Sequence, residues 1–185
     1  MQDQTKQQKR QQSQQQPSGK NEKGELVSEA VAEHVAQVLT FGLNKEVYGL
    51  NILNIKEIIG HGHITRVPMM PEFIAGVINL RGNVVPVVDL ALRFSEKPSP
   101  RTKRSSIVIL EIECDEQTIE IGITVDAVDE VLDIPTDEIK LPPSFGTKIR
   151  ADFISGMVKA GDNLLVLLEI ENILSIAELS RVSGE

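Results

Sequence analysis

The sequence predicts a mainly β protein made of two similar modules, each a small barrel or part of a sandwich. Residues 73–90 return without a gap as residues 153–170, and residues 48–59 are echoed in the same order by residues 121–132. Short apolar stretches are separated by turn signals about every 8 to 12 residues, which is typical of small β domains. Only 3% of the residues are aromatic and none is Trp, so the predicted core is aliphatic.

The repeated unit is tens of residues long, which suits a small folded module and is too long for one turn of a solenoid. A second matched block in the same order argues against chance similarity. We therefore expect the duplication to determine the fold, and function to lie where the copies differ. The identities in the longer pair of segments are Phe73/Phe153, Ile74/Ile154, Gly76/Gly156 and Asn83/Asn163.

Composition and charge narrow the class of protein further. Residues 1–24 are rich in Gln and poor in aliphatic residues, so they cannot offset the entropy of ordering a chain. We expect a disordered tail there and a folded domain over residues 25–185. The tail carries a net charge of +3, which leaves −11 on the rest of a chain whose total is −8. An acidic body disfavours binding to nucleic acid or to an anionic membrane.

Nothing in the sequence predicts export or membrane insertion. It has no run of about 18 apolar residues, and its polar beginning lacks the apolar stretch of a secretion signal. We therefore expect a cytoplasmic protein. Cys114 is the only cysteine, which excludes an intramolecular disulfide. Its apolar-rich strand, followed by two acidic residues, favours an inert thiol over a nucleophile.

The first module begins with a segment of modest helical character, Glu29–Gln37. Val38–Leu43 and Glu46–Asn51 have the pattern of strands, joined across Asn44-Lys45, a pair suited to a tight turn. Ile52–Ile59 fits neither a helical nor a strand period cleanly, but its matched segment begins within a good strand. We therefore predict a bent strand for it.

A second hairpin completes the first module. Its strands are Gly76–Leu80 and Asn83–Asp89, and it turns at Arg81-Gly82. Pro86 has no N–H to donate, so its strand should lie at an edge there or be locally bulged. The polar, basic, Pro-containing stretch at residues 96–105 indicates a surface loop between the modules.

The second module repeats this plan. Ser106–Glu113 and Thr118–Asp126 form a hairpin over Cys114–Gln117, and the repeated hairpin turns at Gly161-Asp162. Glu169–Leu179 places its apolar residues on one face and is the best predicted helix in the chain. The predicted units are a first barrel over about residues 37–95, a loop over residues 96–105, a second barrel over about residues 106–168 and a C-terminal helix over residues 169–179.

Groups that could carry catalysis are sparse. His61 and His63 could present two imidazoles to a metal, but an i, i+2 pair with no nearby Cys or acidic ligand favours a solvated loop. The chain holds no Gly-X-Ser-X-Gly nucleophile elbow and no Gly-rich phosphate-binding run. We therefore expect a binding protein with no catalytic residue, no cofactor and no metal.

The tip of the repeated hairpin is where the copies differ. Gly82 and Gly161 each supply the backbone freedom that a tight turn needs. Arg81 is not required by the turn, and its counterpart in the second copy is Gly161. A guanidinium has five donors for the carboxylates or carbonyls of a partner, which favours a contact role. The alternatives are a solvated turn arginine and an internal bridge to a carboxylate.

Other positions are the same in both copies, which favours structural roles. Glu57 and Glu130 are expected to make a shared contact, such as a hydrogen bond to nearby backbone. Gly76 and Gly156 are expected to mark a bulge or a close backbone approach. Several aliphatic residues are expected in the core or along a seam between the modules where a partner helix could insert, namely Ile55, Ile107, Val125 and Val131.

Five stretches of the sequence carry a more specific signal. They are Val47–Ile52, Ile55–Ile59, Thr65–Pro68, Phe73–Leu90 and Gly122–Val128. Together they resemble the CheW-type chemotaxis coupling proteins. The most specific part is the Ile-Asn-Leu-Arg-Gly block with its Pro-Val-Val-Asp continuation, and the resemblance covers roughly residues 37 to 179.

The resemblance implies two five-stranded SH3-like barrels packed through a common aliphatic core, in agreement with the duplication. It also implies an adaptor without catalytic activity that binds the cytoplasmic tip of methyl-accepting transmembrane chemoreceptors and the regulatory domain of the histidine kinase CheA. Binding both at once raises their effective concentration. Two alternatives stay open: a CheW-like scaffold of another chemosensory-type pathway, such as surface motility, and a small-molecule-binding barrel.

The resemblance also implies site residues. Arg81 matches the arginine of the Asn-Leu-Arg-Gly motif, and Glu57 and Ile55 match positions near the receptor-facing groove, so these three are the implied receptor-binding residues. Neither nucleic acid nor direct membrane insertion is expected. The positions implied to be partner interfaces or sensitive for the fold are Gly76, Ile107, Val131 and Gly156.

Overall fold

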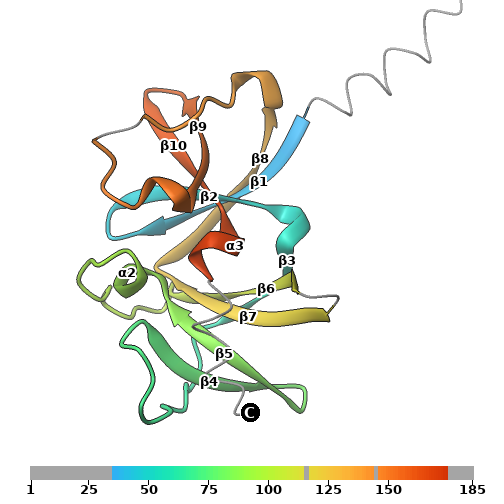
Figure 1. Cartoon of the computed structure of the whole chain (residues 1–185), viewed down its shortest axis with the longest axis vertical. Coiled ribbons are helices and arrows are strands. Elements are labelled where there is room, and N and C mark those ends of the chain that lie inside the picture. The colour runs from blue at the N-terminus through green and yellow to red at the C-terminus, as the bar shows by residue number, and fades with distance from the viewer. Residues whose placement is uncertain (1–34, 115–116, 144–145, 175–185) are drawn as a thin grey trace, which may run out of the picture. The chain divides into compact units, whose positions relative to one another are not determined.

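The computed structural model describes residues 35–114, 117–143 and 146–174, which form two five-stranded sheets and a few short helices (Figure 1). The predicted tail over residues 1–24 and the end of the predicted C-terminal helix, residues 175–179, lie outside the described residues. The strands are β1 Val35–Leu43, β2 Glu46–Asn51, β3 Ile55–Gly60, β4 Ile74–Leu80, β5 Asn83–Asp89, β6 Ser106–Cys114, β7 Gln117–Val125, β8 Ala127–Pro135, β9 Ile154–Ala160 and β10 Asn163–Leu168.

The two sheets repeat one pattern of strands. The strand order is β8-β1-β2-β10-β9 in one sheet, called sheet A, and β3-β6-β7-β5-β4 in the other, called sheet B. Shifting every strand number by five converts one order into the other. The duplication predicted from the sequence is therefore present in the structure, with β1–β5 as one copy and β6–β10 as the other.

Each sheet combines strands from both halves of the chain, so the predicted grouping of strands is wrong. That grouping placed one barrel over about residues 37–95 and another over about residues 106–168. Instead, β1 and β2 pair with β8 and β10, whereas β6 and β7 pair with β3 and β5. The chain changes sheet at a short 3-10 turn, Ile52–Asn54, between β2 and β3. The prediction failed because a repeat shows which segments are alike and not which segments pair.

The mainly β fold with two pseudo-repeated five-stranded units is confirmed, but the sheets are not closed barrels. Among the described residues, the edge strands β8 and β9 of sheet A do not pair with each other, and neither do β3 and β4 of sheet B. An isolated bridge extends each sheet beside one edge strand. Thr65 pairs with Val77 of β4, and Lys140 pairs with Met157 of β9.

Local structure follows the sequence at the hairpins. Asn44 and Lys45 have φ of 49° and 71°, the left-handed pair that a two-residue hairpin turn needs. β5 pairs with β7 only from Val87 onward, so the strand is at an edge at Pro86, as predicted. β1 already begins at Val35, which corrects the predicted helical segment at residues 35–37.

The helices are short. Helix α2, Leu90–Arg93, was not predicted from the sequence and is capped by Asp89, whose Oδ1 accepts from the Leu92 N–H at 3.1 Å. Helix α3, Ile170–Ile173, begins one residue after the predicted start at Glu169. None of the helices in the described part of the chain is long and apolar enough to cross a membrane.

The core consists of one central cluster shared by both sheets and one smaller cluster within each sheet. The central cluster is largely aliphatic, as predicted, but four aromatic rings run through it with successive centroids 5.5 to 6.1 Å apart. Because β1, β2, β6 and β7 all contribute to this cluster, the two sheets share one interior. The four rings belong to Phe41, Tyr48, Phe94 and Phe153.

Candidate functional site

The tip of the β4–β5 hairpin holds an arginine in a backbone conformation that favours glycine. Arg81 has a φ of 52°, and Gly82 follows with 96°. The Gly82 N–H donates to Asn79 Oδ1 at 2.9 Å, which closes the turn. The matched residue of the other copy is Gly161, with a φ of 60°. A left-handed non-glycine residue costs about 1 kcal/mol, so the geometry of the turn does not itself favour an arginine here.

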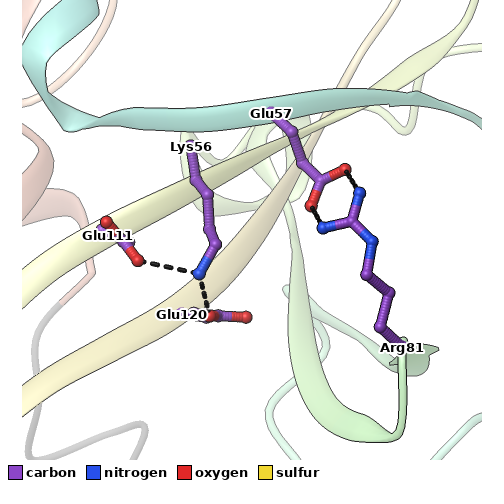
Figure 2. Close-up of polar contacts among 5 residues, drawn as sticks. All are labelled: Lys56, Glu57, Arg81, Glu111 and Glu120. Carbon is purple, nitrogen blue, oxygen red and sulfur yellow. Dashed lines mark hydrogen bonds and ion pairs between the residues drawn. The ribbon is translucent and has the colours of Figure 1, made fainter.

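The Arg81 guanidinium forms a two-bond ion pair with Glu57 of β3 (Figure 2). Nη1 donates to Oε1 at 2.9 Å and Nη2 donates to Oε2 at 2.8 Å. β3 and β4 are the two edge strands of sheet B, so the pair ties one edge to the hairpin at the other edge. The arginine side chain is still 73% exposed, against 21% for the glutamate. The structure therefore shows an internal carboxylate bridge that leaves much of the guanidinium open to a partner.

The matched glutamates, which were expected to share a structural role, differ in the contacts that the structure gives them. In sheet A, the backbone of Glu130 exchanges two hydrogen bonds with the Thr40 hydroxyl: Oγ1 donates to the Glu130 carbonyl at 2.9 Å and accepts from its N–H at 3.2 Å. In sheet B the contact of Glu57 is through its carboxylate. With a glycine in place of Arg81, the second copy lacks the partner that the Glu57 carboxylate uses.

A second ion-pair cluster lies next to the first on β3. The Lys56 ammonium donates to Glu111 Oε1 at 2.8 Å and also contacts Glu120, so it lies between two carboxylates (Figure 2). The hydrogen bonds to Glu111 and Glu120 raise the pKa of Lys56 above its ordinary value. This cluster was missed by the sequence analysis, although the predicted hairpin over residues 114–117 already places the two glutamates opposite each other.

The other implied site residues are dispersed. Ile55 begins β3, two residues before Glu57, and packs half-buried against the central cluster. Ile107 is fully buried in the cluster within sheet B. Val131 lies on β8 of sheet A and is 50% exposed. The structure thus places Ile55, Glu57 and the buried Ile107 in sheet B, with Arg81 at the tip of its β4–β5 hairpin. Of these, Glu57 and Arg81 are in contact, whereas Val131 lies on the other sheet.

Both predicted glycines lie where another segment crosses closely. A Cβ on Gly76 would overlap the Thr65 carbonyl, at 2.8 Å from its carbon, and the residue has a φ of 141°. A Cβ on Gly156 would overlap the Ile139 methyl Cγ2. The crossing segments are the ones that form the isolated bridges at residues 65 and 140. Close approach of the crossing segment therefore accounts for both glycines, through its backbone at Gly76 and through the Ile139 side chain at Gly156.

Sheet A carries an apolar surface that the sequence analysis did not identify. Val47, Leu141 and Leu164 are 45%, 86% and 57% exposed. They lie around two neighbouring cavities, one of about 300 Å³ and a more open one of about 610 Å³, which share Met157 and Leu164. Exposed apolar residues gathered in this way are typical of protein interaction sites.

The two histidines of the His61-Gly62-His63 segment differ in exposure. His61 lies half-buried in the loop after β3, whereas His63 is exposed. No group of three or more potential metal ligands occurs among the residues that the structure describes.

The fold and these surfaces define a class of protein: a duplicated β domain with an exposed arginine ion pair on one sheet and a group of exposed apolar residues on the other. The chain belongs to the CheW family, because the model of the CheW-like domain matches residues 37–178. It is accordingly an adaptor of chemotaxis signalling.

Individual relatives agree with this membership. The chain is 34% identical over 159 residues to the chemotaxis protein CheW of Klebsiella aerogenes, covering 85% of this chain and 93% of the relative. It is 32% identical to the protein FrzA of Myxococcus xanthus, covering 71% and 77%. The crystal structure of the scaffolding protein TtCheW from Thermoanaerobacter tengcongensis is similar with a TM-score of 0.70 and 36% identity, covering 76% of this chain and 88% of that one.

Proposed function

We propose that this protein links transmembrane chemoreceptors to the histidine kinase CheA without catalysing a reaction itself, in the cytoplasm at membrane-associated receptor arrays. The proposal combines the family membership with one observation, the exposed arginine at the tip of the β4–β5 hairpin. Arg81 occupies a strained backbone position, is oriented by Glu57 and still exposes 73% of its side chain. A turn that only had to reverse the chain would use glycine there, as the other copy does.

The receptor side of the proposal rests on Arg81, Glu57 and Ile55. The two bonds to Glu57 fix the plane of the guanidinium, so less entropy is lost when a partner binds it. The remaining donors suit carboxylates or helix-end carbonyls at a receptor tip. Ile55, half-buried at the start of the same strand, adds apolar contact beside the charged pair.

The kinase side needs a second surface, because a linker must hold two partners at the same time. The apolar surface around Val47, Leu141 and Leu164 is on sheet A and shares no residue with the Arg81 site on sheet B. We propose it as the surface for the regulatory domain of CheA. Charged side chains at its rim, such as the ion-paired Glu46 and Lys148, would orient that domain.

Titration calorimetry tests both sides of the proposal. The protein is titrated against the isolated CheA regulatory domain and against a receptor fragment carrying the cytoplasmic tip. Arg81→Ala should weaken receptor binding about tenfold or more and leave kinase binding unchanged. Leu164→Asp should do the reverse, because it places a charge in the apolar surface.

Arg104→Ala is the matched control for Arg81→Ala. Its side chain is 75% exposed and lies 3.6 Å from Asp129, so it is also an exposed arginine in an ion pair. It should change neither affinity by more than about twofold. Equal losses for the two arginine variants would remove the receptor assignment, and no binding to the kinase domain would overturn the linking role.

A second candidate function is that of a CheW-like scaffold in another chemosensory-type pathway. The similarity to FrzA supports this candidate. The same fold and surfaces would serve a different kinase and receptor. Titration against the regulatory domain of each CheA-type kinase in the same organism distinguishes the two, since the partner with the highest affinity identifies the pathway.

A further inference from the structure

We propose that Lys56 is a positioning residue for the Arg81 site: by bridging Glu111 and Glu120 it holds β3 so that Glu57 presents its carboxylate to Arg81. The effect of Lys56 on receptor binding rests on the proposed function, whereas its effect on the position of Arg81 does not. Its structural part concerns two neighbouring ion-pair clusters that both begin on β3 (Figure 2).

The first step is the unfavourable pair that Lys56 neutralises. Glu111 of β6 and Glu120 of β7 are direct cross-strand partners. Like charges at directly opposed positions destabilise a sheet. The Lys56 ammonium contacts both carboxylates, so a residue of the edge strand β3 reaches across β6 to β7. The bridge ties the edge strand to two inner strands instead of one.

The second step is the local weakness of β3. The β3–β6 register shifts between Ile55 and Glu57, which leaves Lys56 in a bulge without a Cα partner. A bulge interrupts the ladder and changes the direction in which the neighbouring side chains point. β3 pairs with only one strand, so its backbone at this point is held by few ladder bonds. The Lys56 bridge supplies the constraint that the interrupted ladder lacks, one residue before Glu57.

The third step is the comparison of sheet B with sheet A. The β1–β8 register of sheet A shifts at the corresponding place, between Leu39 and Phe41. The positions matching Lys56, Glu111 and Glu120 there are Asp129, Gly42 and Val47, which cannot form such a bridge. The second copy also lacks the arginine at its hairpin tip. The lysine bridge and the arginine site are thus both present in sheet B and both absent from sheet A.

Arginine side-chain NMR on the whole protein tests the inference without any partner. A two-bond ion pair slows rotation of the guanidinium about the Nε–Cζ bond, and the Arg81 signal is identified by its loss in Arg81→Ala. Lys56→Gln should speed the Arg81 rotation at least about threefold. Lys56→Arg, which keeps the charge and the reach, should restore slow rotation. Lys148→Gln removes a surface ion pair of sheet A and should have no effect.

A triple variant separates positioning from simple relief of repulsion. Lys56→Gln combined with Glu111→Gln and Glu120→Gln removes the opposed charges together with the bridge. Thermal stability should recover relative to Lys56→Gln alone, whereas Arg81 should stay mobile and receptor-fragment affinity should stay reduced. Recovery of slow Arg81 rotation in the triple variant would overturn the inference, as would slow rotation in Lys56→Gln.

Binding of the receptor fragment is measured separately from the Arg81 rotation and does not depend on the NMR result. If Lys56 acts through the Arg81 site, Lys56→Gln should add no further loss of receptor affinity in an Arg81→Ala background. A receptor fragment that does not bind the unchanged protein would refute the proposed function and leave the NMR result to decide the positioning role.

Discussion

The hairpin tips of β4–β5 and β9–β10 both begin with a left-handed residue, but their side chains differ and so does the backbone of the second residue, which is left-handed at Gly82 and not at Asp162. Both turns place their first residue in the left-handed region, Arg81 at 52° and Gly161 at 60°. Sheet A uses the residue that suits the geometry, and sheet B uses one that does not. In sheet B the arginine binds Glu57, whose match in sheet A is Glu130, and the neighbouring Lys56, which has no matching lysine, bridges Glu111 and Glu120. The comparison teaches that matched features build the fold, whereas the proposed site also depends on two residues without a match in sheet A, Arg81 and Lys56.

The two close-approach glycines, unlike the hairpin tips, play the same part in both sheets. Gly76 and Gly156 are matched, and each allows a crossing segment to form one bridge with the strand of that glycine. The small clusters within the two sheets are likewise built from matched positions, such as Ile107 in sheet B and Val38 in sheet A. Substitutions at two matched positions should therefore destabilise the protein in the same way. The size of the loss should differ only because the local packing differs.

The largest effect is expected for the glycine pair. Gly76→Ala should destabilise the protein by more than about 3 kcal/mol or prevent folding, because the new Cβ meets a backbone carbonyl at a φ that favours glycine. Gly156→Ala should cost less, about 1 to 2 kcal/mol, since it meets a side-chain methyl that can shift. Urea unfolding of both variants measures the difference. A larger loss for Gly156→Ala would contradict the assignment of the backbone clash.

The next effect concerns the cores within the sheets. Ile107→Ala should cost about 2 to 5 kcal/mol, and Val38→Ala at the matched position should cost somewhat less, because fewer buried atoms are removed. Val131→Ala, at a half-exposed position of sheet A, should stay within about 1 kcal/mol. Denaturation midpoints of the three variants rank them. If the Val131 variant proves as unstable as the Ile107 variant, the role of Val131 is structural after all.

A pH effect should appear in the copy that carries Tyr48. Burial, with added repulsion from Glu96 and Glu46, raises the pKa of Tyr48 to about 12 from 10.0. The neutral phenol is therefore favoured by folding, so stability present below pH 10 is lost as the pH rises toward 12. The matched residue Ile121 cannot titrate. The melting temperature of Tyr48→Phe should fall less between pH 9 and pH 11 than that of the unchanged protein, and parallel curves would contradict the prediction.

The smallest effect on stability is expected at the arginine itself. Arg81→Gly makes the first hairpin tip resemble the second, relieving about 1 kcal/mol of backbone strain and removing an exposed ion pair worth about 0.2 to 1 kcal/mol. The free energy of unfolding should change by less than about 1 kcal/mol, while receptor binding weakens about tenfold or more, as for Arg81→Ala. Equilibrium unfolding and calorimetry on the same variant check both halves. A large loss of stability would show that the arginine serves the fold.

The sequence by itself determined the local and repetitive features of this protein. The duplication is visible when two distant stretches of the sequence are compared. The hairpins at residues 44–45 and 81–82, the edge position at Pro86 and the special status of Arg81 follow from short-range patterns. Each depends on the backbone preferences of a few neighbouring residues, which act in the same way wherever the segment lies. The family motif is local in the same sense.

Only the tertiary structure decided which strands share a sheet and which charges meet. The repeat could not show that β1 and β2 pair with strands of the other half, because two alike halves satisfy the same local patterns whether or not they exchange strands. Glu57 and Arg81 are 24 residues apart, and Lys56 and Glu120 are 64 apart. Contacts at such separations depend on how the strands are arranged in the whole domain, and no local pattern records that arrangement.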